Sequence, residues 1–253
     1  MTLALAICCR DGIVFAADSQ STLLTPGQYT RQDTEKLYLL GDRIAWAGAG
    51  TVGAIQRVEH VLTQQAGDIV RAFSSSHELG ARKIHSRVSA VQREVAAEIL
   101  GDPMEEGTSA YLFGGYGASG QFLLEIDSSG VRQWCERGHF TAIGSGAIYA
   151  VHAYRSIAHY RLPSLSLVQA QAFAYRTVEN AIATAALGLG GATRLVTVTP
   201  AGAGALGDTD IKAVQDTVDI WKQREVEILA ELHPATAEAE AVRAGELDEP
   251  PSE

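Results

Sequence analysis

A threonine at the second position carries the first chemistry that the sequence suggests. Thr2 directly follows Met1, and removal of Met1 would leave Thr2 with a free α-amine beside its own hydroxyl. A free α-amine titrates at about 7.7–8.0, so it can accept the proton of a hydroxyl near neutral pH without a histidine. The residue therefore offers a nucleophile and its base together, although many chains begin Met-Thr by chance.

An aspartate and a lysine could support such a threonine. Asp18 ends an apolar run, and Lys36 begins another. A lysine charge favours the alkoxide and the neutral amine, and a carboxylate beside the lysine offsets the cost of burying that charge. We expect Thr2, Asp18 and Lys36 to meet in one site. Each residue alone is more often a member of a surface ion pair.

The opening hairpin is the element that must bring these residues together. Apolar runs over residues 2–9 and 13–17 flank Asp11-Gly12, a strong hairpin turn signal. In a hairpin of two equal strands, the end of the second strand lies beside the start of the first, which places Asp18 near Thr2. Few polar residues interrupt either run, so both faces of these strands should be covered.

The rest of the chain alternates groups of strands with pairs of helices. A polar loop with a turn at Pro26-Gly27 is expected over residues 19–34. The expected strands cover residues 36–40, 43–47, 109–114, 121–127, 131–136, 140–143 and 195–199. The expected helices cover 51–73, the stripe from Ile84 to Ile99 that ends at 101–103, 147–160, 166–187 with a Ser166/Gln169 capping box, and 211–232.

Grouped strands favour antiparallel sheets with helices on their outer faces. We therefore predict the α+β class, as a four-layer α-β-β-α sandwich in a single domain over residues 1–232. Residues 233–253 form an acidic tail in which we expect little fixed structure.

Composition excludes several classes of function. The 253 residues carry 20 Lys+Arg against 30 Asp+Glu, and the net charge of −10 disfavours binding to a nucleic-acid backbone. Cys8, Cys9 and Cys135 give neither a disulfide framework nor a CxxC pair. No apolar run reaches the roughly 20 residues of a membrane span, and the first residues lack the basic leader of a signal peptide. We expect a cytoplasmic protein without membrane or nucleic-acid partners.

Common cofactor and metal signatures do not fit. The GxGxxG pattern at residues 115–120 is followed by a strand, and the one at 48–53 lacks an acidic residue at the end of a second strand. No GxSxG, HExxH or P-loop motif occurs, and the seven histidines show no metal-ligand spacing. We expect no cofactor and no metal site.

The N-terminal motifs resemble proteasome β-type subunits and the related bacterial peptidases that partner ATP-driven unfoldases. The resemblance rests on Thr2, on the run from Asp11 to Ser19, on Thr22, on Lys36-Leu37-Tyr38, on Ala49-Gly50-Thr51-Val52-Gly53 with Gln56, and on Gly144-Ser145-Gly146. It implies the sandwich of N-terminal-nucleophile (Ntn) hydrolases and a threonine endopeptidase that degrades intracellular polypeptides. It also implies a homo-oligomeric ring, with an ATP-dependent unfoldase as a possible partner.

The resemblance also assigns roles to residues. Thr2 resembles the nucleophile, Asp18 and Lys36 its supporting pair, and Ser145 a hydrogen-bond partner of the terminal amine. Gly50 would supply the oxyanion-hole N–H and, with Thr22, would pair with the substrate strand. The residues expected to line the pocket for the side chain before the cut are Ser21, Thr34, Gly48 and Val52.

Two positions depart from the family pattern and leave alternatives open. Ala186 and Leu189 stand where proteasome β subunits usually have an aspartate and a serine before Gly190-Gly191. A ring subunit with little or no activity is therefore one alternative to the peptidase. An amidase or transpeptidase that uses the same nucleophile is the other.

Overall fold

The computed structural model describes residues 2–25, 28–99, 109–184 and 188–232. Five features considered above lie outside these residues: Met1, the expected turn at Pro26-Gly27, the helix stop at 101–103, Ala186 and the expected tail at 233–253.

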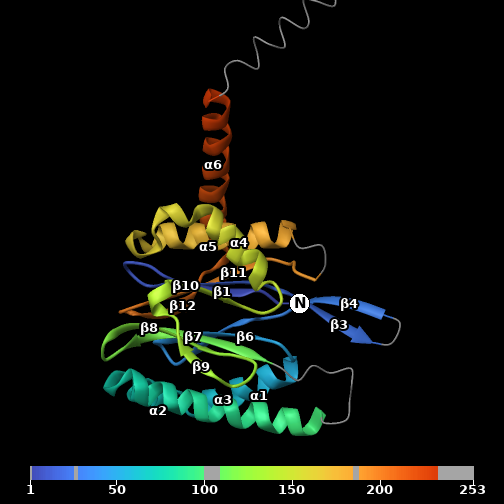
Figure 1. Ribbon diagram of the computed structural model, residues 1–253, viewed down its shortest axis with the longest axis vertical. Coiled ribbons are helices and arrows are strands. Elements are labelled where there is room, and N and C mark those ends of the chain that lie inside the picture. The colour runs from blue at the N-terminus through green and yellow to red at the C-terminus, as the bar shows by residue number, and fades with distance from the viewer. Residues whose placement is uncertain (1, 26–27, 100–108, 185–187, 233–253) are drawn as a thin grey trace, which may run out of the picture.

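Two five-stranded antiparallel sheets face each other, and helices cover the outer side of each (Figure 1). The predicted four-layer α-β-β-α sandwich is thereby confirmed. The first sheet has the order β10-β1-β2-β11-β12, and its strands are β1 (Ala4–Cys8), β2 (Ile13–Asp18), β10 (Phe140–Ile143), β11 (Thr193–Thr199) and β12 (Gly202–Ala205). The second has the order β5-β6-β7-β8-β9, and its strands are β5 (Leu37–Leu40), β6 (Ile44–Ala49), β7 (Ala110–Gly117), β8 (Gly120–Ile126) and β9 (Arg132–Trp134).

The helices fall into two sets. The set over the second sheet is α1 (Val52–Gln64), α2 (Ala66–Ser75) and α3 (His77–Ile99). The set over the first sheet is α4 (Ala147–Ile157), α5 (Leu167–Thr184) and α6 (Asp208–Leu232). Three short 3-10 turns complete the described structure: η1 (Glu136–Gly138), η2 (Ala158–Tyr160) and η3 (Leu162–Ser164).

Alternate residues of β1 contribute to two different hydrophobic cores, one on each face of the first sheet. Leu5 and Ile7 pack outward against the helices of the first sheet, whereas Ala4 and Ala6 pack inward between the two sheets. This alternation is the period of two that a strand imposes. Every residue of β1 and β2 is buried, so the expectation that both faces are covered is confirmed.

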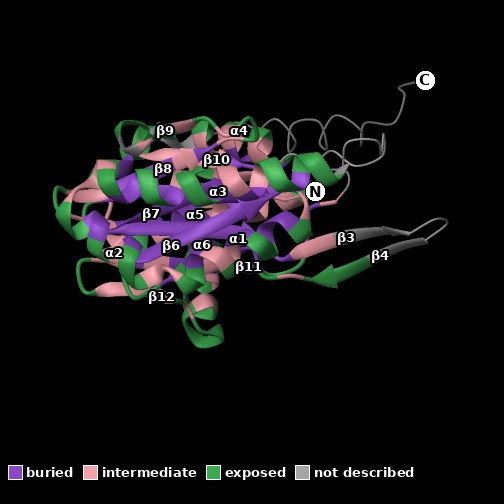
Figure 2. Ribbon diagram, turned by 90° about the horizontal axis from the view of Figure 1, so that it is seen from below, coloured by how far each residue is buried: buried purple, intermediate pink, exposed green. Residues whose placement is uncertain are grey.

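The expected polar loop over residues 19–34 is wrong. The segment forms a two-stranded antiparallel ribbon, β3 (Gln20–Thr25) and β4 (Gln28–Asp33), which leaves the sandwich beside the N-terminus (Figure 2). A ribbon outside both sheets needs no apolar face, so its sequence lacks the alternation by which a strand is normally detected. Backbone pairing holds it, with Ser21 opposite Gln32.

The single helix expected over residues 51–73 is also wrong. The helix is interrupted at Gln65, where the backbone leaves helical geometry; α1 ends before this residue and α2 begins after it. The break lets α1 bury Val58 and Leu62 while α2 buries Ile69 and Phe73 against the same sheet. Strand β12 was not expected, because Gly202–Ala205 contains only glycine and alanine. The Ser166/Gln169 capping box is present, with the Ser166 backbone N–H donating to Gln169 Oε1 at 2.9 Å.

Candidate active site

The opening hairpin brings Asp18 to the first residues of the chain. β1 and β2 pair in the register Ala4 opposite Ala17, so Asp18 lies next to Leu3. The Leu3 backbone N–H donates to Asp18 Oδ1 at 2.9 Å, and the Asp18 N–H donates to the Leu3 carbonyl at 3.2 Å. The carboxylate is thereby fixed one residue away from Thr2.

Asp18 and Lys36 form a buried ion pair. Lys36 Nζ lies 2.7 Å from Asp18 Oδ1, and the two side chains are 5% and 0% exposed. Lys36 Nζ also donates to the Gln20 carbonyl at 2.7 Å, and the Gly190 N–H donates to Asp18 Oδ2 at 3.3 Å. Burying a charge without a partner costs free energy, and these hydrogen bonds offset part of that desolvation cost for the buried pair.

Burial lowers the pKa of the Lys36 ammonium from 10.5, and the charge of Asp18 opposes part of this shift. Between the folded-state pKa and 10.5 the unfolded chain binds more protons than the folded chain. The contribution of Lys36 to the free energy of unfolding should therefore rise as pH rises through that window.

This pH dependence can be measured without any assay of activity. We expect wild type to gain stability relative to Lys36→Met as pH rises from neutral to 10.5 in chemical denaturation. Parallel curves for the two proteins over that range would contradict a lowered pKa at Lys36.

A tight turn holds the peptide of Thr2. The Thr2 backbone N–H donates to Ser145 Oγ at 3.3 Å, and the Gly146 N–H donates to the Thr2 carbonyl at 3.0 Å. This nitrogen is a peptide nitrogen here and stands for the α-amine that removal of Met1 would create. Gly144, which opens the turn, has φ +89°. A Cβ at Gly144 would collide with the Thr2 carbonyl oxygen, so the turn requires glycine there.

Replacing Gly144 with alanine should therefore displace Thr2. Gly120 is a matched control, because it also has positive φ (+101°) but its Cβ would meet no atom within 4 Å. Gly120→Ala should cost about 1–3 kcal/mol of backbone strain, whereas Gly144→Ala should cost more, measured by denaturant unfolding. Equal losses of stability would contradict the close approach of Gly144 to Thr2.

Gly50 lies at the strand-to-helix turn between β6 and α1. It is exposed, and its φ of +130° favours glycine. A Cβ at Gly144 would also lie 3.2 Å from Ala49 Cβ, so the turn at Gly50 is adjacent to the turn that holds Thr2.

The four expected pocket residues and Thr22 are less well connected to Thr2. Ser21 and Thr34 share a short hydrogen bond at the base of the ribbon. Gly48 is buried, and a Cβ there would lie 3.0 Å from Ile55 Cγ1. Thr22 is placed only by its backbone, opposite Arg31, and Val52 is exposed at the start of α1. Within the described residues no hydrogen bond links Val52 to Thr2.

Three participants were not expected from the sequence. The Gln20 carbonyl accepts from Lys36, the Gly190 N–H donates to Asp18, and Gly144 packs on Thr2. The Gly-x-Gly and Gly-Gly patterns were visible signals for the two glycines, whereas nothing in the sequence marks a single backbone carbonyl. Leu189 is buried, and a Cβ at Gly146 would lie 2.8 Å from its Cδ1, so its methyl groups cover the Thr2 turn.

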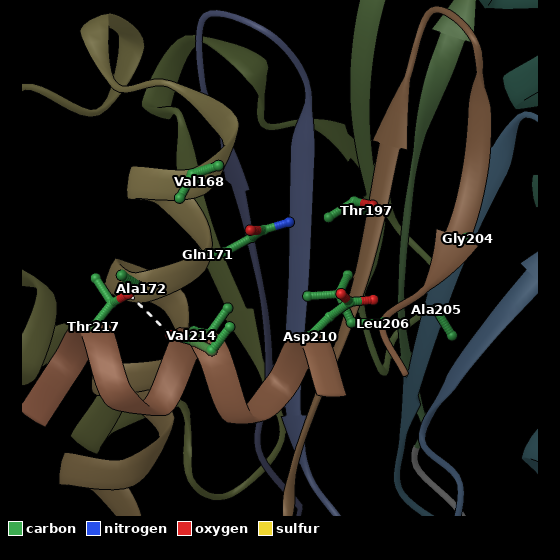
Figure 3. A pocket seen from close by; sticks show the side chains of 11 residues that line it. Val168, Gln171, Ala172, Thr197, Gly204, Ala205, Leu206, Asp210, Val214 and Thr217 are labelled. Carbon is green, nitrogen blue, oxygen red and sulfur yellow. Dashed lines mark hydrogen bonds between the residues drawn. The ribbon is translucent and has the colours of Figure 1, made fainter. Parts of the chain in front are cut away.

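One described cavity lies away from Thr2. It has a volume of about 450 Å³ and opens between α5, α6 and the β11–β12 hairpin (Figure 3). Asp210 supplies the charge in its lining, and Thr217 Oγ1 is turned back to the Ala213 carbonyl at 2.9 Å. Thr2 and its partners do not line this cavity.

The described residues hold no cluster of three or more His, Cys, Asp or Glu side chains that could bind a metal ion. None of the described helices has the length and apolarity needed to span a bilayer.

Comparison with known proteins agrees with the fold and the N-terminal motifs. The sandwich has the Ntn-hydrolase architecture that the sequence resemblance implied. Residues 2–196 match the family described as proteasome subunit, and the chain belongs to that family. It is 27% identical to proteasome subunit beta 1 of Thermococcus kodakarensis over 218 residues, which cover 84% of this chain and 96% of that protein. A protein of the same name from Thermococcus gammatolerans is 30% identical over 150 residues, 59% of this chain and 67% of that protein.

Proposed function

We propose that the chain is a threonine endopeptidase of the proteasome type, with Thr2 as its nucleophile after removal of Met1. The observation that supports the proposal is a set of contacts at the two neighbouring residues Thr2 and Leu3. Asp18 Oδ1 accepts from both Leu3 N–H and Lys36 Nζ, while Ser145 Oγ accepts from the Thr2 nitrogen. A buried ion pair is thus bound to the residue that follows Thr2, and we propose that its cation acts on the Thr2 hydroxyl and amine.

The first half-reaction follows from these groups. Thr2 Oγ1 attacks the scissile carbonyl carbon, and its proton passes to the Thr2 α-amine. The Lys36 charge favours the alkoxide and the neutral amine. The C–N bond then breaks, the amine proton passes to the leaving nitrogen, and an ester between Thr2 Oγ1 and the acyl fragment remains.

The second half-reaction uses the same base. A water molecule gives a proton to the Thr2 amine and attacks the ester carbonyl. The bond between the acyl carbon and Thr2 Oγ1 then breaks, the amine proton passes to Oγ1, and the acyl fragment leaves as a carboxylic acid. The Gly50 N–H is our candidate donor to the tetrahedral oxyanion in both steps. This assignment is supported by the position of the Gly50 turn next to the Gly144 turn that holds Thr2. The loss of one such donor typically lowers the rate about 10²–10³-fold.

Substrate would lie as an extended strand across the mouth of the site. Backbone groups of Thr22 and Gly50 would pair with it by β-addition. The side chain before the cut would enter a pocket formed by Ser21, Thr34, Gly48 and Val52. Ile55 underlies Gly48, so it would form the floor of that pocket.

Membership of a family of subunits favours an assembled protein. We propose a homo-oligomeric ring in the cytoplasm that acts on polypeptides, with an ATP-dependent unfoldase as the partner that delivers them. The domain of residues 1–232 would form the ring.

The test is cleavage of a peptide library by the purified full-length chain, with and without an added amine nucleophile. We expect hydrolysis products from internal peptide bonds. If all products were capped by the added amine, the reaction would be transpeptidation and not hydrolysis. No turnover of any peptide by the assembled protein would contradict the proposal and favour a structural subunit.

A further inference from the structure

The space between the two sheets is not filled at the edge formed by β5 and β12. β5 is an edge strand of the second sheet, and β12 is an edge strand of the first. A cleft of about 390 Å³ opens there, within the range of about 300–1,000 Å³ that small-molecule sites have. Both sheets contribute to its lining, which includes Leu37, Leu39, Arg194, Val196, Ala205 and Leu206.

Small side chains on β12 leave the cleft open. β12 (Gly202–Ala205) contains only glycine and alanine, and Ala205 pairs with Val196, which faces the space between the sheets. Leu37 of β5 faces the same space, and Leu39, two residues further along, faces it too because strand residues alternate between faces. Leu39 meets no large side chain of β12 and is 43% exposed. The cleft therefore presents an apolar wall that the fold leaves uncovered.

The strand register turns one charged side chain into this cleft. Along β11, Val196 faces the space between the sheets, and Arg194 lies two residues before it. The same alternation makes Arg194 face that space as well. Ala17, the pairing partner of Arg194, belongs to the core between the sheets, which supports this placement. The cleft thus combines an apolar wall with a guanidinium.

Arg194 is held by loose contacts at the surface. Its Nη2 lies 3.3 Å from Asp33 Oδ2 and its Nη1 lies 3.8 Å from Asp208 Oδ1, and both carboxylates are exposed. Exposed pairs of this kind contribute about 1 kcal/mol or less. Lys36 also lines the cleft, but it is buried and bound to Asp18. Arg194 is therefore the cation that a ligand in the cleft could engage.

We propose that this cleft binds a small amphipathic carboxylate of the medium-chain fatty acid type. The apolar chain would lie along Leu39 and Ala205, where burial of apolar surface supplies the attraction. The carboxylate would accept two parallel hydrogen bonds from Arg194. The cleft is separate from the pocket proposed for substrate, because a Cβ at Gly48 would point to Ile55 of α1, on the opposite face of the second sheet. Binding does not depend on catalysis by Thr2.

The test is binding of sodium octanoate to the purified full-length protein, measured by isothermal titration calorimetry. Arg194→Gln removes the charge and Ala205→Phe fills the cleft, so each should weaken binding at least about tenfold. Val52→Asp is the matched control, because Val52 is 39% exposed, close to the value for Leu39, but lies at the start of α1. Val52→Asp and Thr2→Ala should both bind octanoate as wild type does.

Analogues of octanoate identify the group that is recognised. Octanamide lacks the charge that pairs with Arg194, so it should bind at least about tenfold more weakly. Octylamine that binds more tightly than octanoate would show that Asp33 and Glu35, which also line the cleft, select a cation, and would overturn the proposal. No binding of octanoate to wild type, or equal affinity in Arg194→Gln, would overturn it as well. Loss of binding in Val52→Asp would place octanoate in the substrate pocket and contradict a separate site.

Discussion

Thr2→Ala should abolish peptidase activity, with kcat/KM lower by at least about 10³-fold. The change removes the attacking oxygen and leaves the Asp18–Lys36 pair in place, because that pair is bound to Leu3 and not to the Thr2 side chain. Alanine is also small enough for Met1 to be removed. The measurement is steady-state hydrolysis of a fluorogenic peptide at equal concentrations of folded protein.

Thr2→Ser is the matched control for this loss. It keeps a hydroxyl and an α-amine on the same residue, so measurable turnover should remain. Wild-type activity in purified Thr2→Ala would contradict Thr2 as nucleophile. The unfolding free energies of the three proteins should agree within about 1 kcal/mol, since Thr2 is only partly buried and neither substitution removes more than a hydroxyl and a methyl group.

Asp18→Ala should both inactivate the protein and destabilise it by about 3–5 kcal/mol. The change leaves the Lys36 charge buried without its carboxylate and removes the acceptor of two backbone N–H groups, those of Leu3 and Gly190. Denaturant unfolding measures the loss of stability. Asp216→Ala is the control, because Asp216 pairs with Lys212 at the surface and such pairs contribute about 1 kcal/mol or less.

A double variant separates the structural role of the pair from its catalytic role. Asp18→Ala with Lys36→Met leaves no buried charge, so it should recover part of the stability that Asp18→Ala loses. Activity should remain absent, because the Lys36 cation proposed to activate Thr2 is gone. If Asp18 and Lys36 were not coupled, the loss of unfolding free energy in the double variant would equal the sum of the losses in the two single variants. That result would contradict a direct interaction between the two residues.

The sequence predicted the sandwich because its strands carry the signal that two covered faces require. β1 is apolar throughout, β2 is apolar up to Asp18, and Asp11-Gly12 joins them, so their pairing and the approach of Asp18 to the start of the chain followed from the turn. The approach of Lys36 did not follow from local pattern. It was proposed from the chemistry that a threonine nucleophile needs and from resemblance to a family.

What could not be predicted has physical reasons. β3 and β4 form a ribbon outside the sheets, so no burial pattern marks them. The helix breaks at Gln65 so that both α1 and α2 can bury residues against the second sheet. This break depends on tertiary packing, which the local sequence does not show. The Gln20 carbonyl and the Gly190 N–H act through backbone atoms, which residue type does not reveal.

The central claim is that Thr2 becomes the first residue and that its own amine and hydroxyl react. Intact-mass spectrometry of the purified protein, before and after treatment with an epoxyketone inhibitor that captures both groups, tests it most directly. The account predicts a chain that begins at residue 2 and gains one inhibitor molecule, with the adduct mapped to Thr2 by peptide sequencing. A chain that retains Met1, or that stays unlabelled at Thr2 while it cleaves peptides, would contradict it.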